Sequence, residues 1–498
     1  MKNIFCFVCW LIPCLLSAQP YFSKSFYLEN DNDGDSGLSI KRFEDGYLIL
    51  CGRKDDLSVE SAGLAKINEN AAIDWVKTYY YGSPPSVPDP GGPDALVIVD
   101  GINYISTNTN NQKFIELLCV DDQGDTLWTR KYDCGLYGGI NIGLIMTSDS
   151  NLLILSGQFI NQQNNKNNIW LQKVDREGNV LWNNFFKPFI YHRPWGPVQE
   201  LADGSFLVSY DVCLPGTSCA FSTGALTKFD QNGNEIWTRT YNQIEIAKAA
   251  SAVPLDNGDI AYAWGRDTFI VNNPNLNEST AVYILDSLGY LKSRHVFESP
   301  AIKELSSLRK LSNGDILGVG GADVFPSLSV GGWLFRMSPS GELLWERTII
   351  DTRFDQNDED TGFFRDATED EDGNIIAVGD IHADPPTYID VWVVKIGGDG
   401  CYGTDCGNTD LYITNTETIV FDDKIMVQPN PAEDYLHIEN KGSFVIDRIE
   451  ILDVAGRILR QMSYVNNPID LKGFDSGLYI AKLSDKKGRI VTKKFIKK

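Results

Sequence analysis

The chain has 498 residues, and 67 acidic residues against 44 basic ones give it a formal net charge of −23. That length is too great for one ordinary hydrophobic core, so the chain is a repeat array or several domains. The acidic balance argues against a nucleic-acid partner, because a phosphate backbone needs a surplus of cations. The charge is uneven: residues 426–498 hold 13 basic and 9 acidic side chains, which leaves 31 basic and 58 acidic ones in the remainder.

The first 18 residues read as a secretory signal peptide. Lys2 precedes an apolar run that ends at Leu16, and the small residues Ser17 and Ala18 follow, so we expect cleavage before Gln19. The run is too short for a comfortable membrane span, and no later segment is long and apolar enough to cross a bilayer. We therefore expect the mature chain to be exported and to carry no transmembrane segment.

Seven of the ten cysteines follow the signal peptide and would meet an oxidising environment. Short loops separate Cys213 from Cys219 and Cys401 from Cys406, and each pair is predicted to form a disulfide. The other three are Cys51, Cys119 and Cys134, an odd number, and the sequence leaves open which of them stays a thiol. Cys51 lies in an apolar run, which favours a buried and inert thiol.

One phrase recurs along most of the chain. Its copy KVDREGNVLWNNFF, residues 173–186, combines a strand end, a tight turn that contains Asp and Gly, and a strand with Trp182. The aligned positions are Trp75, Trp128, Trp182, Trp237, Leu291 in a degenerate copy, and Trp345. Successive positions are 53 to 55 residues apart, so residues 19–407 are interpreted as a repeat region.

Each unit has a second recurring element before this phrase: a turn rich in Asp, Asn and Gly, followed by a continuous apolar run. Seven copies begin at Asp45, Asp100, Ser150, Asp203, Asn257, Asn313 and Asp372. Asp-Gly and Asn-Gly are hairpin signals, and a continuous apolar run is typical of a strand buried on both faces. A unit of about 54 residues has room for four strands, and seven units predict an all-β, seven-bladed β-propeller with four-stranded blades.

The two ends of the repeat region predict how the ring closes. Phe22 lies 53 residues before Trp75, so the strand around it, YFSKSFY, looks like an outer strand without a unit of its own. The seventh unit continues into GGDGCYG at Gly397, where its outer strand is due. We therefore expect the N-terminal strand to complete the seventh blade, which would leave the ring without a free sheet edge.

The Trp residues of the phrase allow two interpretations. They could form a ladder of aromatic and cationic ligand contacts, or they could pack neighbouring blades together with Arg and Lys along the ring faces. A binding site is seldom needed in every unit, so the repetition favours packing. Trp75, Trp128, Trp182, Trp237 and Trp345 are therefore predicted to dock the blades.

These repeats resemble quinoprotein-like β-propellers, whose blades also dock through a Trp that follows an Asp–Gly turn. The resemblance covers the repeats and not a site. The vicinal cysteine pair of pyrroloquinoline quinone dehydrogenases does not occur in this sequence. The repeats also resemble the sialidase Asp-box, but in DQGDTLW an extra residue separates Gly from Trp. Neither resemblance predicts a cofactor here.

No catalytic constellation stands out. The four histidines lie in different units without metal-ligand spacing, and G-x-S-x-G elbows and phosphate-binding glycine loops do not occur. The best candidate for an ion site is DNDGDSG, where Asp31, Asp33 and Asp35 alternate before a glycine and could hold Ca²⁺. An ordinary acidic surface loop is the alternative. A second acidic stretch, Asp351–Gly373, is interpreted as a solvated connection between blades.

Residues 408–425 read as a polar linker, and the pattern then changes. Between Met426 and Lys498, short alternating strands separated by turns predict a small Ig-like β-sandwich. This segment resembles the C-terminal sorting domain of type IX secretion substrates. The matching residues are Pro429, Asn430 and Pro431 at the first strand, Asp453, Gly456 and Arg457 in DVAGR, Gly477 and Tyr479 in SGLYIAKL, and Lys493, Lys494 and Lys498 in the basic closing strand.

The resemblance implies export by the Sec machinery, passage through the outer membrane by the type IX machinery, and removal of the tail. The released body would then be anchored to surface lipopolysaccharide or set free. Both outcomes would place the repeat region outside the cell.

For the repeat region, our first hypothesis is a non-catalytic module that binds a glycan or a protein at one propeller face. Long loops such as YYYGSPPSVPDPGGPD and YHRPWGPV are rich in aromatics and proline and favour ligand binding. The alternative is a hydrolase or lyase of extracellular polysaccharides that uses carboxylates at the channel mouth. Clustered carboxylates with raised pKa values would favour that alternative.

Overall fold

The computed structural model describes residues 21–498, apart from 29–33, 55–59, 80–87, 91–93, 110–111, 161–166, 187–191, 214–221, 242–246, 267–277, 299–302, 324–329, 352–361, 384–387, 404, 408, 414–416, 421–423, 443, 455 and 487. All regular elements in these ranges are β-strands. Within the same ranges there is no helix with the length and hydropathy needed to cross a membrane.

Four sheets contain four antiparallel strands each. They are formed by β2 (Asp35–Phe43), β3 (Gly46–Lys54), β4 (Glu60–Asn68) and β5 (Ile73–Tyr79); by β11 (Gly139–Met146), β12 (Leu152–Phe159), β13 (Asn167–Val174) and β14 (Val180–Phe186); by β15 (His192–Glu200), β16 (Phe206–Cys213), β17 (Ser222–Phe229) and β18 (Glu235–Thr240); and by β19 (Ala247–Pro254), β20 (Ile260–Arg266), β21 (Glu278–Leu285) and β22 (Leu291–Glu298).

Two further sheets have five strands. One contains β6 (Pro88–Pro90), β7 (Leu96–Val99), β8 (Ile102–Thr109), β9 (Phe114–Val120) and β10 (Thr126–Asp133); the other contains β23 (Lys303–Lys310), β24 (Ile316–Asp323), β25 (Val330–Met337), β26 (Leu343–Asp351) and β30 (Asp410–Ile413). β27 (Gly362–Glu369), β28 (Ile375–Ala383) and β29 (Tyr388–Ile396) begin a larger sheet.

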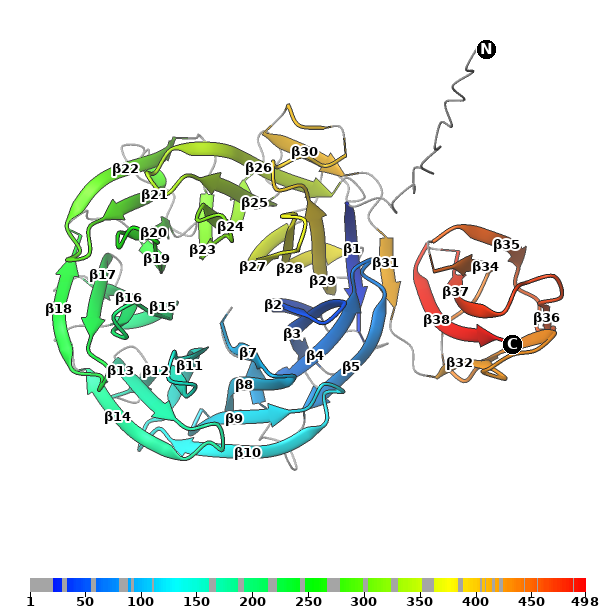
Figure 1. Ribbon diagram of the computed structural model, residues 1–498, viewed down its shortest axis with the longest axis horizontal. Helices are drawn as coiled ribbons and strands as arrows, with labels where there is room; N and C mark the ends of the chain where they lie inside the picture. Colours follow the sequence, from blue (N-terminus) through cyan, green and yellow to red (C-terminus); the bar gives the residue numbers. More distant parts are fainter. Residues whose placement is uncertain are drawn as a thin grey trace, which may run out of the picture.

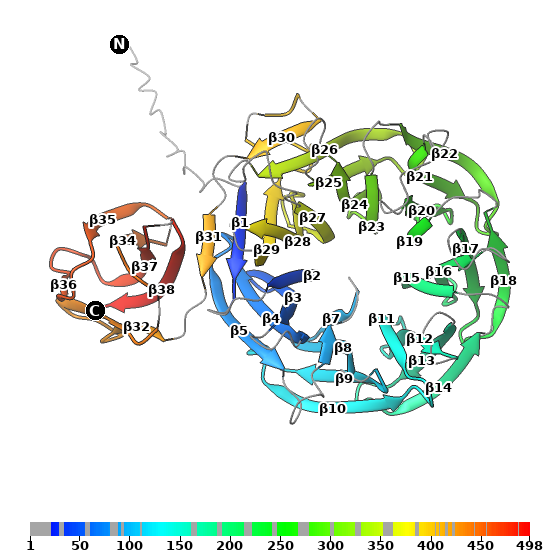
Figure 2. The same ribbon diagram turned by 180° about the vertical axis from the view of Figure 1, so that it is seen from behind.

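The sheets follow one another around a ring, in chain order, as Figures 1 and 2 show from opposite sides. In each sheet of the ring, one strand lies nearest the axis. These inner strands are β2, β7, β11, β15, β19, β23 and β27. The last strands, such as β10, β14 and β18, form the rim. This arrangement of antiparallel sheets is propeller-like.

Tight turns join the third and fourth strands of the sheets, and their sequence explains their shape. In the turn after β13, the Asp175 carboxylate accepts hydrogen bonds from the backbone amides of Glu177 (3.0 Å) and Asn179 (2.8 Å). Gly178 has a φ of 80°, a backbone conformation that residues with a Cβ rarely adopt. Aspartate and glycine are therefore needed at these two positions for local reasons.

Hydrophobic clusters lie between neighbouring sheets. One cluster joins Leu153 and Leu155 of β12 to Val208 of β16 and Phe229 of β17. Comparable clusters occur at other junctions around the described ring. Each sheet is thus buried on both faces, which explains the continuous apolar runs in the sequence.

The strand around Phe22, which has no unit of its own in the sequence, is β1 (Phe22–Tyr27), and it lies beside β29. The two strands are antiparallel, with Phe22 opposite Lys395 and Phe26 opposite Val391. On its other side, β1 is parallel to β31 (Glu417–Val420), and β31 in turn is parallel to β38 (Ile490–Lys497). One continuous sheet runs from the ring into the C-terminal domain, in the order β27-β28-β29-β1-β31-β38-β37-β34-β35, where β37 is Gly477–Ser484, β34 is Arg448–Asp453 and β35 is Ile458–Ser463.

The segment interpreted as a linker, residues 408–425, contains two strands, β30 and β31. β30 is parallel to β26, with Leu411 opposite Ile349, and β31 covers β1. Leu411, Ile413 and Ile419 are all buried. Much of this segment therefore extends two sheets of the ring at its rim.

The C-terminal domain lies beside the ring (Figure 1). Its strands are β32 (Ile425–Gln428), β33 (Tyr435–Asn440), β34 (Arg448–Asp453), β35 (Ile458–Ser463), β36 (Ile469–Asp470), β37 (Gly477–Ser484) and β38 (Ile490–Lys497). β32, β33 and β36 form a small sheet, and the other four strands belong to the continuous sheet. A hydrophobic cluster that includes Leu436, Ile449, Leu483 and Phe495 is shared by the two sheets.

Candidate functional site

The candidate site is a cavity of about 430 Å³ at the centre of the ring. Much of its wall is aliphatic and includes Leu96, Val97, Leu144, Ile145, Met146 and Val253. Lys41, Asp94, Arg309 and Lys310 supply its charged part. Met146 and Lys310 are the last residues of their inner strands, so the cavity lies at the end where the inner strands finish.

Three charged residues of the cavity lining contact a fourth one, Asp366 of β27, and we call Lys41, Asp94, Arg309 and Asp366 the channel cluster. Lys41, Arg309 and Asp366 come from three different sheets, and Asp94 lies just before β7. The Arg309 guanidinium lies between the two carboxylates: its Nε is 2.7 Å from Oδ1 of Asp366, and its Nη1 is 3.1 Å from Oδ2 of Asp94. The Lys41 Nζ lies 3.4 Å from Asp366 and 3.5 Å from Asp94. Two cations therefore balance two carboxylates.

Asp366 is the buried member of the cluster, with a side chain that is 0 % exposed. Its Oδ2 accepts hydrogen bonds from the hydroxyl of Ser39 (2.9 Å) and the amide of Ile40 (3.0 Å), and its Oδ1 accepts one from the amide of Ala367 (2.8 Å). A buried carboxylate stays ionised only when it is paired and hydrogen-bonded, and Asp366 meets both conditions.

The charges hold one another in the ionised state. Burial pushes the pKa of Asp366 upward, but the Arg309 guanidinium and the Lys41 ammonium outweigh it, and the pKa lies below its ordinary value. Burial likewise pushes the pKa of Arg309 downward, and the carboxylates of Asp366 and Asp94 outweigh it, so that this pKa is raised. Asp366 is thus an anion at neutral pH and cannot act there as a general acid.

A recurrent β-bulge positions these side chains. The register with the second strand shifts between Gly37 and Ser39, between Leu305 and Ser307, and between Phe364 and Asp366. A bulge disrupts the ladder locally and re-aims the residues that follow. The amide of Ile40 donates to Asp366, and the amide of Leu308 donates to the hydroxyl of Ser251 (3.0 Å), both across to the preceding sheet. Lys41 and Arg309 are the next residues in their strands.

One of the loops in which the sequence predicted ligand binding, YYYGSPPSVPDPGGPD, ends at Asp94, which lines the cavity. Residues 80–87 and 91–93 of that loop and residues 352–361 of the acidic stretch lie outside the described residues. The structure corrects the interpretation of YHRPWGPV as a second loop, because all of it after Tyr191 belongs to the inner strand β15.

The structure corrects the interpretation of the acidic stretch Asp351–Gly373. Its second half is the inner strand β27, and Asp366 within it is fully buried. The interpretation of the whole stretch as a solvated connection is therefore wrong. The physical reason is that Arg309 and Lys41, which are distant in sequence, neutralise this one carboxylate.

The predicted calcium site is described only at Asp35, since Asp31 and Asp33 lie outside the described residues. Asp35 is 4 % exposed and begins β2. Its Oδ1 lies 3.5 Å from Nε of Arg53, and its Oδ2 accepts a hydrogen bond from the amide of Leu28 (3.0 Å). The calcium site stays a prediction.

The predicted disulfide between Cys401 and Cys406 is present. The other predicted pair involves Cys219, outside the described residues. Cys51, Cys119 and Cys134 are buried free thiols, and burial raises the pKa of each, to about 11 for Cys119 and about 12 for Cys134. Asp399 lies with Cys401 and Cys406 in a group spaced for a metal, but the disulfide uses both sulfur atoms.

The repeated Trp residues lie against the tight turns of the next sheet. The rings of Trp75, Trp128, Trp182, Trp237 and Trp345 face Gly124, Gly178, Gly233, Gly289 and Gly400, and a Cβ added to each glycine would come within 2.7 to 3.1 Å of the ring. A second contact accompanies the first: the hydroxyl of Tyr132 donates to the carbonyl of Gly178 (2.9 Å). The guanidinium of Arg130 lies 5.1 Å from the Trp128 ring centre, consistent with cation–π packing.

The residues of the sorting motif come together in the C-terminal domain. The Asn430 side chain accepts a hydrogen bond from the amide of Ile496 (2.9 Å) and donates one to the carbonyl of Lys494 (3.3 Å). The amide of Lys498 donates to the carbonyl of Ala432 (2.8 Å). The Pro429–Pro431 segment is thus fastened to the basic closing strand that carries Lys493, Lys494 and Lys498.

The remaining motif residues shape the same domain. Gly456 has a φ of 78° in the turn between β34 and β35, where Asp453 accepts hydrogen bonds from the amide (2.9 Å) and Nε (2.7 Å) of Arg457. Gly477 begins β37. The Tyr479 hydroxyl donates to the carbonyl of Asp475 (2.8 Å), and its ring stacks on that of Phe495.

Sequence reasoning missed the channel cluster. Its members lie far apart in the chain, and the local signals are weak: IKRF at Lys41 and LRKL at Arg309 place a cation in an inner strand that should be buried. A buried strand position with a charge predicts an ion-pair partner, but the sequence does not say which carboxylate supplies it.

Residues 426–498 match the family described as the secretion system C-terminal sorting domain. The end of the chain is therefore a type IX secretion sorting domain, as the sequence predicted. A domain of this class implies export to the cell surface or to the outside. No curated protein matches the chain.

Solved structures show a distant likeness to the ring. The chain covers 99 % of the β-propeller domain of the Trilobed protease from Pyrococcus furiosus with 78 % of its own length, at 10 % identity and a TM-score of 0.40. It covers 93 % of a polysaccharide lyase of family PL25, an ulvan lyase, with 73 % of its length, at 11 % identity and a TM-score of 0.46. It covers 93 % of a protein of unknown function from Bacteroides caccae with 63 % of its own length, at 14 % identity and a TM-score of 0.36. Likeness at this level carries no information about ligands.

Proposed function

We propose that the chain is an exported seven-bladed β-propeller that binds a protein segment in its central cavity, without turnover, and that an Ig-like sorting domain directs its export. The observation that supports this function is the cavity of about 430 Å³, whose wall is largely aliphatic and which also contains Lys41, Asp94 and Arg309 of the channel cluster. A cavity of this size falls in the range of small-ligand sites.

The lining favours a peptide over a glycan. Sugars stack on aromatic rings, and the described lining residues include no aromatic side chain. Leu144, Met146 and Val253 offer an apolar surface for a side chain. Lys41 and Arg309, next to Asp94, offer donors and an acceptor that can pair with backbone or carboxylate groups.

The catalytic alternative needs a carboxylate that holds its proton near neutral pH. In the channel cluster the cations act in the other direction, since Arg309 and Lys41 keep the pKa of Asp366 below its ordinary value. Asp94 is held by the same Arg309. This pairing supports a binding site over a polysaccharide hydrolase or lyase that would use these carboxylates.

A peptide-display library and a glycan array, each probed with the full chain, test the proposal. We expect peptides with an aliphatic anchor to bind, and Met146→Glu to abolish binding because it places a charge on the apolar wall. Leu136→Glu is the matched control, because Leu136 is 87 % exposed outside the cavity. Binding of glycans alone, or release of cleaved polysaccharide, would overturn the proposal.

A further inference from the structure

The sorting domain is joined to the ring by strand pairing. β31 lies between β1 and β38 and is parallel to both. Ile419 of β31 lies opposite Phe26 on the ring side and opposite Ile490 on the side of the sorting domain. One strand thus serves as the link between two folded units.

The side chains at this link belong to both cores. Ile490 of the sorting domain is 5 % exposed and packs in the same cluster as Phe22 and Phe26 of β1 and Ile419 of β31. The next residue of β31, Val420, belongs instead to the cluster of the sorting domain. A residue of the sorting domain therefore completes the hydrophobic core at the closing sheet of the ring.

The repeat pattern changes where the sorting domain meets the rim. In five outer strands the residue before the Trp position is apolar or aromatic and 48 to 55 % exposed: Leu127, Leu181, Ile236, Tyr290 and Leu344. In β5 that residue is Asp74, and its carboxylate forms an ion pair with the Lys494 ammonium of β38. Ile73, Ile480 and Val491 lie beside this pair. The departure from the repeat places a charge complementary to the basic closing strand.

We propose that closure of the ring by β1 creates the surface on which the sorting domain docks. Without β1, β31 has no ring strand to pair with, and Phe22 and Phe26 are missing from the cluster that receives Ile490. The basic end of β38 is then no longer held toward Asp74. The position of the sorting domain therefore depends on whether the ring is complete. This inference is independent of any ligand bound in the central cavity.

Hydrogen exchange of the full chain tests the proposal with a variant on the ring side. Ser25 lies opposite Trp392 on one side and Thr418 on the other, so Ser25→Pro removes an amide from a strand that is paired on both edges. We expect the amides of β31 and of the first residues of β38 to exchange at least tenfold faster. The amides of β15–β18, in a separate sheet, should keep their protection and show that the rest of the ring is folded.

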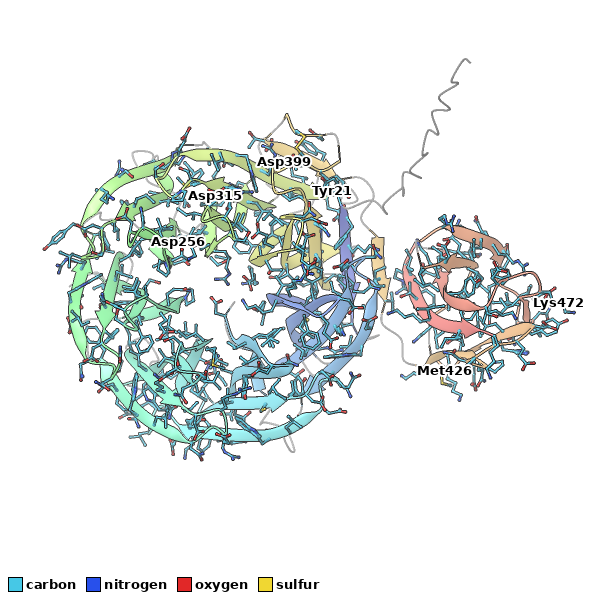
Figure 3. The ribbon with its side chains drawn as sticks, viewed as in Figure 1. Tyr21, Asp256, Asp315, Asp399, Met426 and Lys472 are labelled. Atoms are coloured by element: carbon cyan, nitrogen blue, oxygen red, sulfur yellow. A yellow bond between two sulfur atoms is a disulfide. The ribbon has the colours of Figure 1, made fainter. Side chains whose placement is uncertain are left out.

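A second variant acts on the docking side. Ile490→Asp places a charge among apolar side chains, so the amides of β31 should exchange at least tenfold faster. The amides of the β1–β29 pairing and of β37 should stay protected. Small-angle scattering should show a larger maximum dimension. Lys472→Glu is the matched control, because Lys472 lies on the side of the domain away from the ring (Figure 3) and should change nothing. Unchanged exchange of β31 and β38 in Ser25→Pro would overturn the proposal, and so would opening of the β1–β29 pairing in Ile490→Asp.

Discussion

The indole of Trp182 lies on Gly233, which belongs to the tight turn of the next sheet in the ring. A Cβ added at Gly233 would come within 2.7 Å of the indole, and the backbone there has a φ of 77°. Glycine is therefore required at this position twice, for its conformation and for the space that the ring occupies. Because the relationship recurs in four other pairs, the rim of the ring is held by a repeated contact between an aromatic ring and bare backbone.

Gly233→Ala should lower the free energy of unfolding by about 3 kcal/mol, because it adds a steric clash with Trp182 to the strain of a positive φ. Gly258 is the matched control, since it has a φ of 85° with no atom within 4 Å of an added Cβ. Gly258→Ala should cost only about 1 kcal/mol. Chemical denaturation followed by tryptophan fluorescence measures both values, and equal losses would contradict a role for the ring contact.

Leu291 occupies the Trp position in the degenerate copy and is 56 % exposed. The turn that it should cover contains Gly341, whose nearest neighbours are Ile284 and Ser293. Leu291→Trp should raise the free energy of unfolding by about 1 kcal/mol, because the larger ring can bury apolar area against this turn. Leu344→Trp is the control: it enlarges a side chain that is 48 % exposed, one residue before the docking position. A gain of the same size in both variants would refute the contact.

How much of this could be predicted depends on whether a feature is local. The phrase around Trp182 repeats, and its turn, strand and ring contacts are set within one unit and its neighbour, so the sequence shows them directly. The disulfide between Cys401 and Cys406 and the turn in which Asp453 binds Arg457 are local in the same way.

The channel cluster shows why the rest could not be predicted. Arg309 meets Asp94 and Asp366 only because the ring brings three sheets to one axis, and the register of each inner strand sets the height at which they meet. Asp366 lies in an acidic stretch that is otherwise typical of a surface loop. Asp74 departs from the repeat, but its partner Lys494 lies in another domain, so the sequence does not pair the two residues.

Arg309→Met should lower the free energy of unfolding by about 4 kcal/mol, because it leaves Asp366 buried with a weaker counter-charge. Lys41→Met should cost about 1 kcal/mol or less, since Arg309 remains and the Lys41 side chain is 28 % exposed. Urea denaturation at pH 7 measures the two losses. A double variant, Arg309→Met with Asp366→Leu, removes both charges and should recover part of the stability; no recovery would contradict the burial argument.

Acid should weaken the ring through the turns that join first and second strands. Burial pushes the pKa of Asp149 upward, but hydrogen bonds from the Lys173 ammonium, Thr147 and Asn151 outweigh it and lower the pKa to about 2. The Lys228 ammonium likewise lowers the pKa of Asp203 to about 2 against the effect of burial. A pKa depressed on folding contributes stability above the ordinary value of 3.8, and this contribution is lost as the pH falls through 2. Asp149→Asn and Lys173→Met should both flatten the fall in unfolding free energy between about pH 4 and pH 2. Asp122→Asn, at an exposed turn position, serves as the control, and an equal flattening there would count against the ion pair.

Asn430 fastens the start of the sorting domain to its last strand through the amide of Ile496 and the carbonyl of Lys494. Asn430→Ala removes both hydrogen bonds, a loss of about 1 kcal/mol each, and should let the end of β38 open more often. We expect the amide of Ile496 to exchange at least fivefold faster, carboxypeptidase to remove Lys498 sooner, and less of the full chain to reach the outside of the cell. Asn466→Ala is the matched control, because this exposed asparagine of the same domain lies outside the β38 contact. If Asn430→Ala and Asn466→Ala exchange, digest and export alike, the side chain of Asn430 does not hold the closing strand.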